Sequence, residues 1–395
     1  MHRLFISLML LIVCGLSPVA GANDEASPPA DSSPGSSLIS LYRSGSLSDI
    51  NDHLNLGADP NNKDGLEGMT PLMLAAASNS DPDVSRLLIR KGARLNDRES
   101  HLGFTPLMFS AAFNVPTVTQ ALIEEGADLE IRDNSGGTAL YHAASVASNA
   151  ATVLLLTKAG ADLEAADQDG VTPLMNAAIN GRLQSVHTLV RAGAKLEARS
   201  SNGRTPLLFA AADNRDPLIM ARLIEAGADL EARDNDGLTP FLAASAGNTR
   251  PVLEELKKHG ADVRAVDNSG ADALLQAALS NSNPDVVNFL VHEIGADLNT
   301  PRENGLTPIL AAAVNPVPEV TRELIVAGAD VSARGPHGRT ALMLAAAFNP
   351  NDEVARILAA AGADPLEKDE AGLNALEYAG DARPELLDFL RRRSK

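Results

Sequence analysis

The chain has no tryptophan, and aromatic residues make up only 3% of its 395 residues. A core without large rings must be mostly aliphatic, and small side chains suit helices that lie close together. The single cysteine excludes a disulfide within the chain. Basic residues are also scarce, with 33 Lys and Arg against 51 Asp and Glu and a net charge of −18. This charge opposes binding to nucleic acid or anionic lipid and permits basic protein partners.

Residues 1–22 have the pattern of an export signal. A short basic start is followed by an apolar run over residues 4–16 and by the small-x-small site Ala20-Gly21-Ala22. We expect cleavage after Ala22 and a periplasmic protein, with the extracellular medium as the alternative destination. Cys14 lies inside the apolar run, which leaves lipidation open. No later stretch is long and apolar enough to span a membrane.

Residues 23–37 are rich in Ser, Pro and Asp and predict a disordered linker. After them the dipeptide Gly-Ala recurs ten times at spacings of 33 to 35 residues. A period of this length indicates a stack of small repeated units rather than a globular domain around one pocket. The glycines of these pairs are Gly57, Gly92, Gly126, Gly160, Gly193, Gly227, Gly260, Gly295, Gly328 and Gly362.

Each unit repeats the same signals for two helices. A Thr-Pro-apolar start, as at Thr70-Pro71-Leu72, supplies an N-cap and a proline at the first helical position of a short Ala-rich helix. A second start, such as Pro82-Asp83, opens a bulkier apolar helix that ends at the Gly-Ala pair. An Asn recurs at the end of the first helix, and we interpret it as a left-handed C-cap. The alternative is an exposed row of amides that binds a ligand.

These signals, with Gly-Ala-Asp and Leu-Glu-Ala-Arg-Asp in the loops, resemble the ankyrin repeat over residues 38–395. Together with the export signal, the chain resembles exported bacterial members of that family. The resemblance implies an all-α solenoid of eleven helix pairs with β-turn fingers. We expect an N-terminal capping unit at 38–69, nine repeats over 70–373 and a C-terminal capping unit at 374–395. Where the family usually has His, this chain has Met73, Met108 or Tyr141, so the hydrogen bonds of that His must be absent or replaced by packing.

The resemblance implies a non-enzymatic scaffold that binds a partner protein on its concave face. The histidines are scattered without metal-ligand spacing, and the motifs of nucleophiles, phosphate loops and dinucleotide sites are missing. We therefore predict no catalytic, metal or cofactor site, no nucleic-acid partner and a monomer. Alternatives are a secreted effector that acts on the proteins of another cell, and an enzyme of unknown type.

Candidate partner contacts are aromatic side chains on or beside the first helices. They are Phe109, Phe113, Tyr141, His142, Phe209 and Phe348. The same side chains could instead fill the space left by the missing His. Basic residues six positions after the Gly of the Gly-Ala pair should line up along the fingers. They include Arg132, Arg199 and Arg233, which form either a solvated ladder of salt bridges or a polar rim for the partner.

Overall fold

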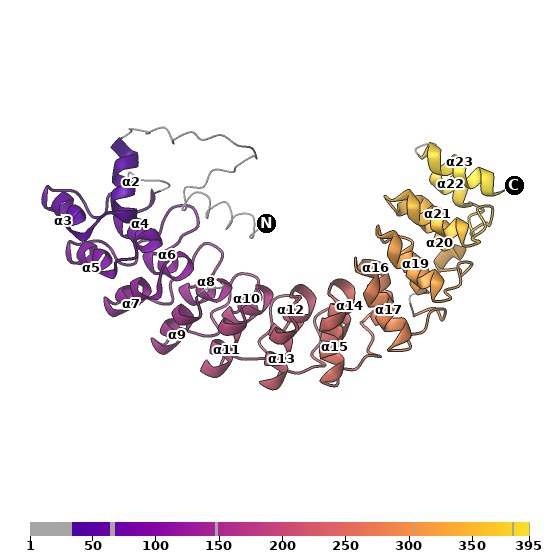
Figure 1. Ribbon diagram of the computed structural model, residues 1–395, viewed down its shortest axis with the longest axis horizontal. Helices are drawn as coiled ribbons and strands as arrows, with labels where there is room; N and C mark the ends of the chain where they lie inside the picture. Colours follow the sequence, from indigo (N-terminus) through magenta and orange to yellow (C-terminus); the bar gives the residue numbers. More distant parts are fainter. Residues whose placement is uncertain (1–33, 64–67, 147–148, 304, 381–382, 395) are drawn as a thin grey trace. The chain divides into compact units, whose positions relative to one another are not determined.

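The computed structural model describes residues 34–63, 68–146, 149–303, 305–380 and 383–394. Over these residues the chain forms 22 α-helices in eleven consecutive pairs (Figure 1). The described residues form no sheet, and their only β structure is two isolated bridges, Val266–Asp272 and Arg334–Thr340. The predicted all-α array of helix pairs is therefore confirmed. The predicted export signal and nearly all of the predicted linker lie outside the described residues.

The first helices of the pairs carry even numbers, and from α4 onward they are short and rich in Ala. They are α2 (Pro34–Ser44), α4 (Pro71–Ser78), α6 (Pro106–Phe113), α8 (Ala139–Ser145), α10 (Pro173–Ile179), α12 (Pro206–Asp213), α14 (Pro240–Gly247), α16 (Ala273–Ser280), α18 (Pro308–Ala312), α20 (Ala341–Phe348) and α22 (Ala375–Ala379).

The second helices carry odd numbers, and most bury one face. They are α3 (Leu47–Asn55), α5 (Pro82–Arg90), α7 (Pro116–Glu124), α9 (Ala150–Lys158), α11 (Leu183–Ala192), α13 (Pro217–Glu225), α15 (Arg250–Lys258), α17 (Pro284–His292), α19 (Pro318–Val326), α21 (Asp352–Ala360) and α23 (Pro384–Arg393). A short 3₁₀ turn, η2 (Pro336–Gly338), lies in the finger before α20.

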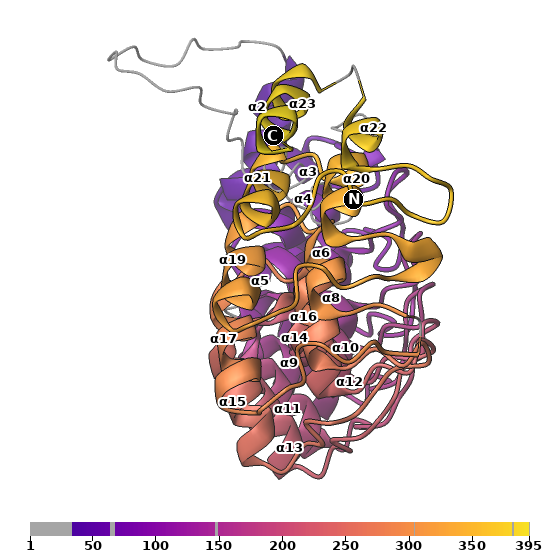
Figure 2. The same cartoon turned by 90° about the vertical axis from the view of Figure 1, so that its right-hand side faces the viewer.

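The helix pairs divide into two compact units. One unit comprises the described residues up to Ala177 together with 187–195, and the other comprises 178–186 together with those from Leu196 onward. Within each unit, first helices pack against first helices and second helices against second helices. The fingers project on the side of the first helices, so each unit has three layers (Figure 2).

Most first helices begin at a threonine cap, and its geometry explains one departure from the family pattern. At α6, Thr105 Oγ1 accepts a hydrogen bond from Met108 N at 3.3 Å. The Thr105 N–H in turn donates to the Met108 thioether sulfur at 3.4 Å. The buried methionine therefore completes the cap and fills the core at the position where the family usually has His.

The recurring asparagines do not act as left-handed caps, so that prediction is wrong. Asn248 has φ −104°, in the extended region. Its side chain is buried, and its amide donates to Ala211 O at 2.7 Å and to Asn214 O at 2.8 Å in the preceding repeat. Each Asn thus satisfies the orphan carbonyls at the end of the previous first helix. Because most of these amides are buried, the alternative of an exposed amide row is also wrong.

This asparagine ladder continues where the sequence pattern is broken. In the repeat of α8, Asn149 lies two residues later than usual and donates to Ala111 O at 2.6 Å. In the last unit Arg383 replaces Asn and donates to Ala346 O at 2.8 Å and to Asn349 O at 2.7 Å. The ladder therefore depends on a donor in this place rather than on one residue type.

A second ladder joins the loops that follow the second helices. The Glu197 carboxylate accepts the backbone N–H of Asp229 at 2.9 Å, and the Glu231 carboxylate accepts that of Asp262 at 2.8 Å. The glutamates of the recurring Leu-Glu pair are therefore structural, and they bind one repeat to the next within each unit.

Candidate functional site

The arginines Arg132, Arg199 and Arg233 tie neighbouring fingers together through backbone carbonyls. Arg199 Nη1 donates to Gly203 O at 3.1 Å in its own finger and to Arg233 O at 2.7 Å in the next finger. Arg132 and Arg233 make the same pair of contacts in their repeats. No carboxylate of the described residues lies within ion-pair distance of these three, so the predicted salt ladder is wrong there. All three side chains are exposed and remain candidates for a polar rim.

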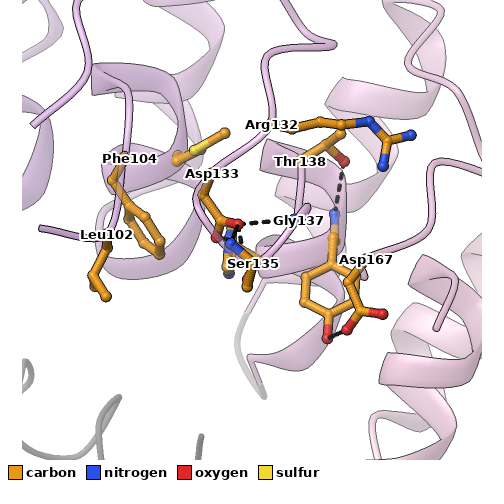
Figure 3. A network of polar contacts seen from close by, with 12 residues as sticks. Leu102, Phe104, Arg132, Asp133, Ser135, Gly137, Thr138 and Asp167 are labelled. Carbon is orange, nitrogen blue, oxygen red and sulfur yellow. Dashed lines mark hydrogen bonds and ion pairs between the residues drawn. The ribbon is translucent and has the colours of Figure 1, made fainter. Parts of the chain in front are cut away.

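A buried polar network lies beneath the finger that precedes α8 (Figure 3). The Asp133 Oδ2 atom lies 2.7 Å from His142 Nε2, while Oδ1 accepts the N–H groups of Ser135 at 2.7 Å and Gly137 at 2.9 Å. Because an ionised carboxylate only accepts hydrogen bonds, Nε2 carries the proton of this contact. The carboxylate therefore fixes both the finger turn and the first helix below it.

Electrostatics favour the ionised form of Asp133 despite its burial. Burial alone would raise the pKa of Asp133, but the hydrogen bond and charge of His142, together with hydrogen bonds from Ser135 and Gly137, outweigh burial and hold the pKa below its usual value. The side chain of Asp133 is 2% exposed. Asp133 and His142 consequently form a buried pair that joins the finger to the first helix.

Tyr141 extends this network to the next repeat. Its hydroxyl donates to Asp167 Oδ2 at 2.8 Å, and burial together with the Asp167 charge raises the pKa of Tyr141. Tyr141 is 7% exposed and His142 is 5% exposed. Both side chains are therefore buried within the repeats rather than exposed, and contact with a partner stays a prediction for them.

Two more predicted contacts, Phe109 and Phe209, also lie in the interior. Phe109 is fully buried, with its ring edge-on to Phe104 at 5.4 Å between centroids. Phe209 is 8% exposed, and the Arg204 guanidinium covers its ring at 5.8 Å. Both fill the space between the first helix and the finger, which was the alternative left open by the sequence.

Phe348 and Phe113 differ from the other aromatic residues because they stand at the last position of a first helix. Phe348, at the end of α20, is 61% exposed. Phe113, at the end of α6, is half-buried, and its ring lies 6.4 Å from that of Phe109. The structure thus leaves Phe348 as the aromatic candidate most accessible to a partner.

Phe348 does not stand alone in its unit. Leu279, near the end of α16, is 45% exposed, and Val314, just after α18, is partly exposed. These three residues come from three consecutive repeats and precede the ladder asparagines Asn281, Asn315 and Asn349 by one or two positions. We call them the apolar strip. Apolar side chains that remain at least partly exposed at the ends of neighbouring first helices are typical of an interaction surface.

The sequence analysis missed Leu279 and Val314 because it searched for aromatic residues. For Val314 the available signal was its position directly before the recurring Asn, where other repeats have Ser78, Asp213 or Gly247. For Leu279 it was the position two residues before the Asn, where other repeats have Ala77 or Ala212. A large aliphatic residue at a position that elsewhere is small or polar would have marked the strip.

No three His, Cys, Asp or Glu side chains gather as metal ligands within the part of the chain that the structure describes. A membrane-spanning helix is likewise not found among the described helices.

Comparison with known proteins agrees with the helix-pair architecture. A family model described as ankyrin repeats (3 copies) matches overlapping windows that together span 39–390. The windows are residues 39–133, 76–167, 108–200, 140–234, 207–302, 274–369 and 309–390. A comparison with curated proteins found no match. Because the family model covers nearly all of the array, the chain belongs to the ankyrin repeat family.

Proposed function

We propose that the protein is an exported, non-enzymatic scaffold that binds a partner protein on the finger and first-helix side of its repeats. The observation that carries this proposal is the apolar strip of Leu279, Val314 and Phe348. These side chains remain at least partly exposed, whereas the amides of the adjacent Asn281, Asn315 and Asn349 are used in bonds between repeats. A rigid stack loses little conformational entropy on binding, so a short strip with a polar rim can give useful affinity.

Export is supported by the sequence of residues 1–22 alone. We expect the mature protein to begin at Asn23 and to be recovered from the periplasm of the producing cells. Amino-terminal sequencing of the protein recovered from separated cell fractions identifies both the first residue of the mature chain and the compartment that holds it. Recovery of a full-length chain from the cytoplasm would contradict export, and recovery from the medium would favour the secreted effector.

Replacing Phe348 with serine should abolish most partner binding and leave the fold intact. Removing a large exposed contact weakens a protein interface by about 2 kcal/mol, or roughly thirtyfold. The measurement compares proteins retained from an envelope extract by wild type and by Phe348→Ser, followed by titration calorimetry with the retained protein.

Leu56→Ser is the matched control, because Leu56 is 88% exposed but lies at the C-terminal end of α3, outside the strip. The control should retain the partner as wild type does. Equal retention by wild type and Phe348→Ser would show that the strip is not the binding surface.

A further inference from the structure

A second apolar surface lies on the opposite layer, across the second helices at the C-terminal end of the second unit. Helices α19, α21 and α23 pack side by side there (Figures 1 and 2). A groove of about 540 Å³ lies over these helices, and its apolar lining includes Ile325, Val326, Ile357, Ala360 and Phe389. We call it the second-helix groove.

Val326 marks this groove as a surface that is incompletely covered. Its side chain is 82% exposed at the last position of α19. The neighbouring Phe389 on α23 is partly exposed. Covering an exposed aliphatic side chain and the apolar depression beside it with another molecule lowers the free energy of the system.

The rim of the groove is basic in a chain whose net charge is −18. Arg322, Arg356 and Arg393 line it together with one acid, Glu353, which pairs with Arg322 at 2.7 Å. No carboxylate among the described residues is within ion-pair distance of Arg356 or Arg393. Two positive charges at the groove therefore lack a counter-charge from the described chain.

Stacking on Phe389 holds these two arginines in place. The Arg356 guanidinium lies 5.0 Å from the ring centroid and that of Arg393 lies 5.7 Å from it. Arg393 Nη1 also donates a long hydrogen bond, 3.5 Å, to Ala359 O. A guanidinium stacked on a ring keeps N–H donors at its edge, where a carboxylate can be bound bidentately.

We propose that the second-helix groove docks a segment of a partner protein in which carboxylates flank aliphatic or aromatic side chains. The apolar side chains cover Val326 and Phe389, and the carboxylates neutralise Arg356 and Arg393. A protein segment fits better than an anionic membrane, because the net charge of the whole chain repels an extended negative surface. This surface is separate from the apolar strip, so either proposal can fail without the other.

The test is selection of random displayed peptides of about 16 residues, long enough for about four helical turns, on the full chain. Bound peptides are counter-selected on Val326→Asn and on Arg393→Glu. We expect enriched sequences rich in Asp or Glu around Leu, Ile or Phe. Fluorescence anisotropy of a labelled enriched peptide should show binding about tenfold weaker with either variant. Added salt should weaken the binding to wild type.

Matched controls are Leu56→Asn, which replaces another highly exposed aliphatic residue, and Arg90→Glu, which makes the same charge change on α5. Both should bind the peptide as wild type does, and thermal unfolding should confirm that all four variants are folded.

Enrichment of neutral or basic peptides, or of no peptide that depends on Val326 and Arg393, would overturn the proposal. Two other outcomes would also contradict it by identifying a different occupant. One is co-sedimentation with phosphatidylglycerol vesicles that is lost in Val326→Asn. The other is a dimer in analytical ultracentrifugation that the same substitution dissociates.

Discussion

Replacing Asn248 with alanine should lower the free energy of unfolding by about 2–3 kcal/mol. The substitution removes two donors from Ala211 O and Asn214 O and one acceptor from the backbone N–H of Thr249. Asn248 is 2% exposed, so water cannot replace these bonds without opening the repeat. Urea denaturation followed by circular dichroism measures the loss.

Two further variants separate the hydrogen bonds from other effects. Asn248→Asp keeps the shape of the side chain but points a carboxylate at two carbonyl oxygens. At neutral pH it should therefore lower the free energy of unfolding by more than Asn248→Ala does. Asn235→Ala is the control, because the Asn235 amide donates to Ser201 O at 3.1 Å on the exposed tip of a finger. It should cost less than about 1 kcal/mol.

The unfolding profile of Asn248→Ala also tests how locally the stack is held together. Each repeat contacts mainly its neighbours, so a weakened interface between α12 and α14 should broaden or split the transition. A loss below about 0.5 kcal/mol, with a single sharp transition, would show that the ladder contributes little to stability.

The period of the sequence predicted the architecture because the helix signals are local. Thr105-Pro106 opens a helix through atoms of its own turn, and Gly92 ends one through its own φ of 96°. Such rules need no knowledge of neighbouring repeats. Ten copies of the same local signals left one arrangement, the stack of helix pairs.

The role of the asparagines could not be predicted in the same way, since it depends on the preceding repeat. Both Gly181 and Asn248 end a stretch of first-helix sequence, but Gly181 has φ 69° and Asn248 has φ −104°. The C-cap interpretation treated the two residues as equivalent because it considered only the backbone of each residue and not its side chain. The acceptors of the Asn248 amide lie 34 and 37 residues earlier in the chain.

The same limit explains why most of the aromatic candidates, which the sequence analysis expected to be accessible, are buried. Phe109 and Phe348 both lie on first helices, four and eight positions after the capping Thr105 and Thr340 respectively. Four positions after the cap the side chain packs under the finger, and eight positions after it the side chain reaches the open end of the helix. Composition treats them alike, whereas burial by neighbouring segments separates them.

The second large effect is expected from Asp133→Ala, which should lower the free energy of unfolding by about 3–5 kcal/mol, because it leaves a buried partner uncompensated. The imidazole of His142 and the N–H groups of Ser135 and Gly137 all lose their acceptor. Chemical denaturation at neutral pH measures this loss.

Asp128→Ala is the matched control in the same repeat. Its exposed carboxylate accepts only the backbone N–H of Glu130, at 2.9 Å, so the expected loss is below about 1 kcal/mol. Equal losses for Asp128→Ala and Asp133→Ala would show that the buried network adds nothing beyond an ordinary turn.

The pH dependence of the Asp133 effect distinguishes a charged network from simple packing. The pKa of Asp133 is lower in the folded protein than in the unfolded chain, where it is about 4. A carboxyl group of this kind contributes stability above the unfolded pKa, and the contribution is lost as the pH falls through the folded pKa. The difference in stability between wild type and Asp133→Ala should therefore be largest near neutral pH and should shrink below about pH 4. A difference that stays constant from pH 7 down to acid pH would mean that Asp133 stabilises the finger through its shape rather than through its charge.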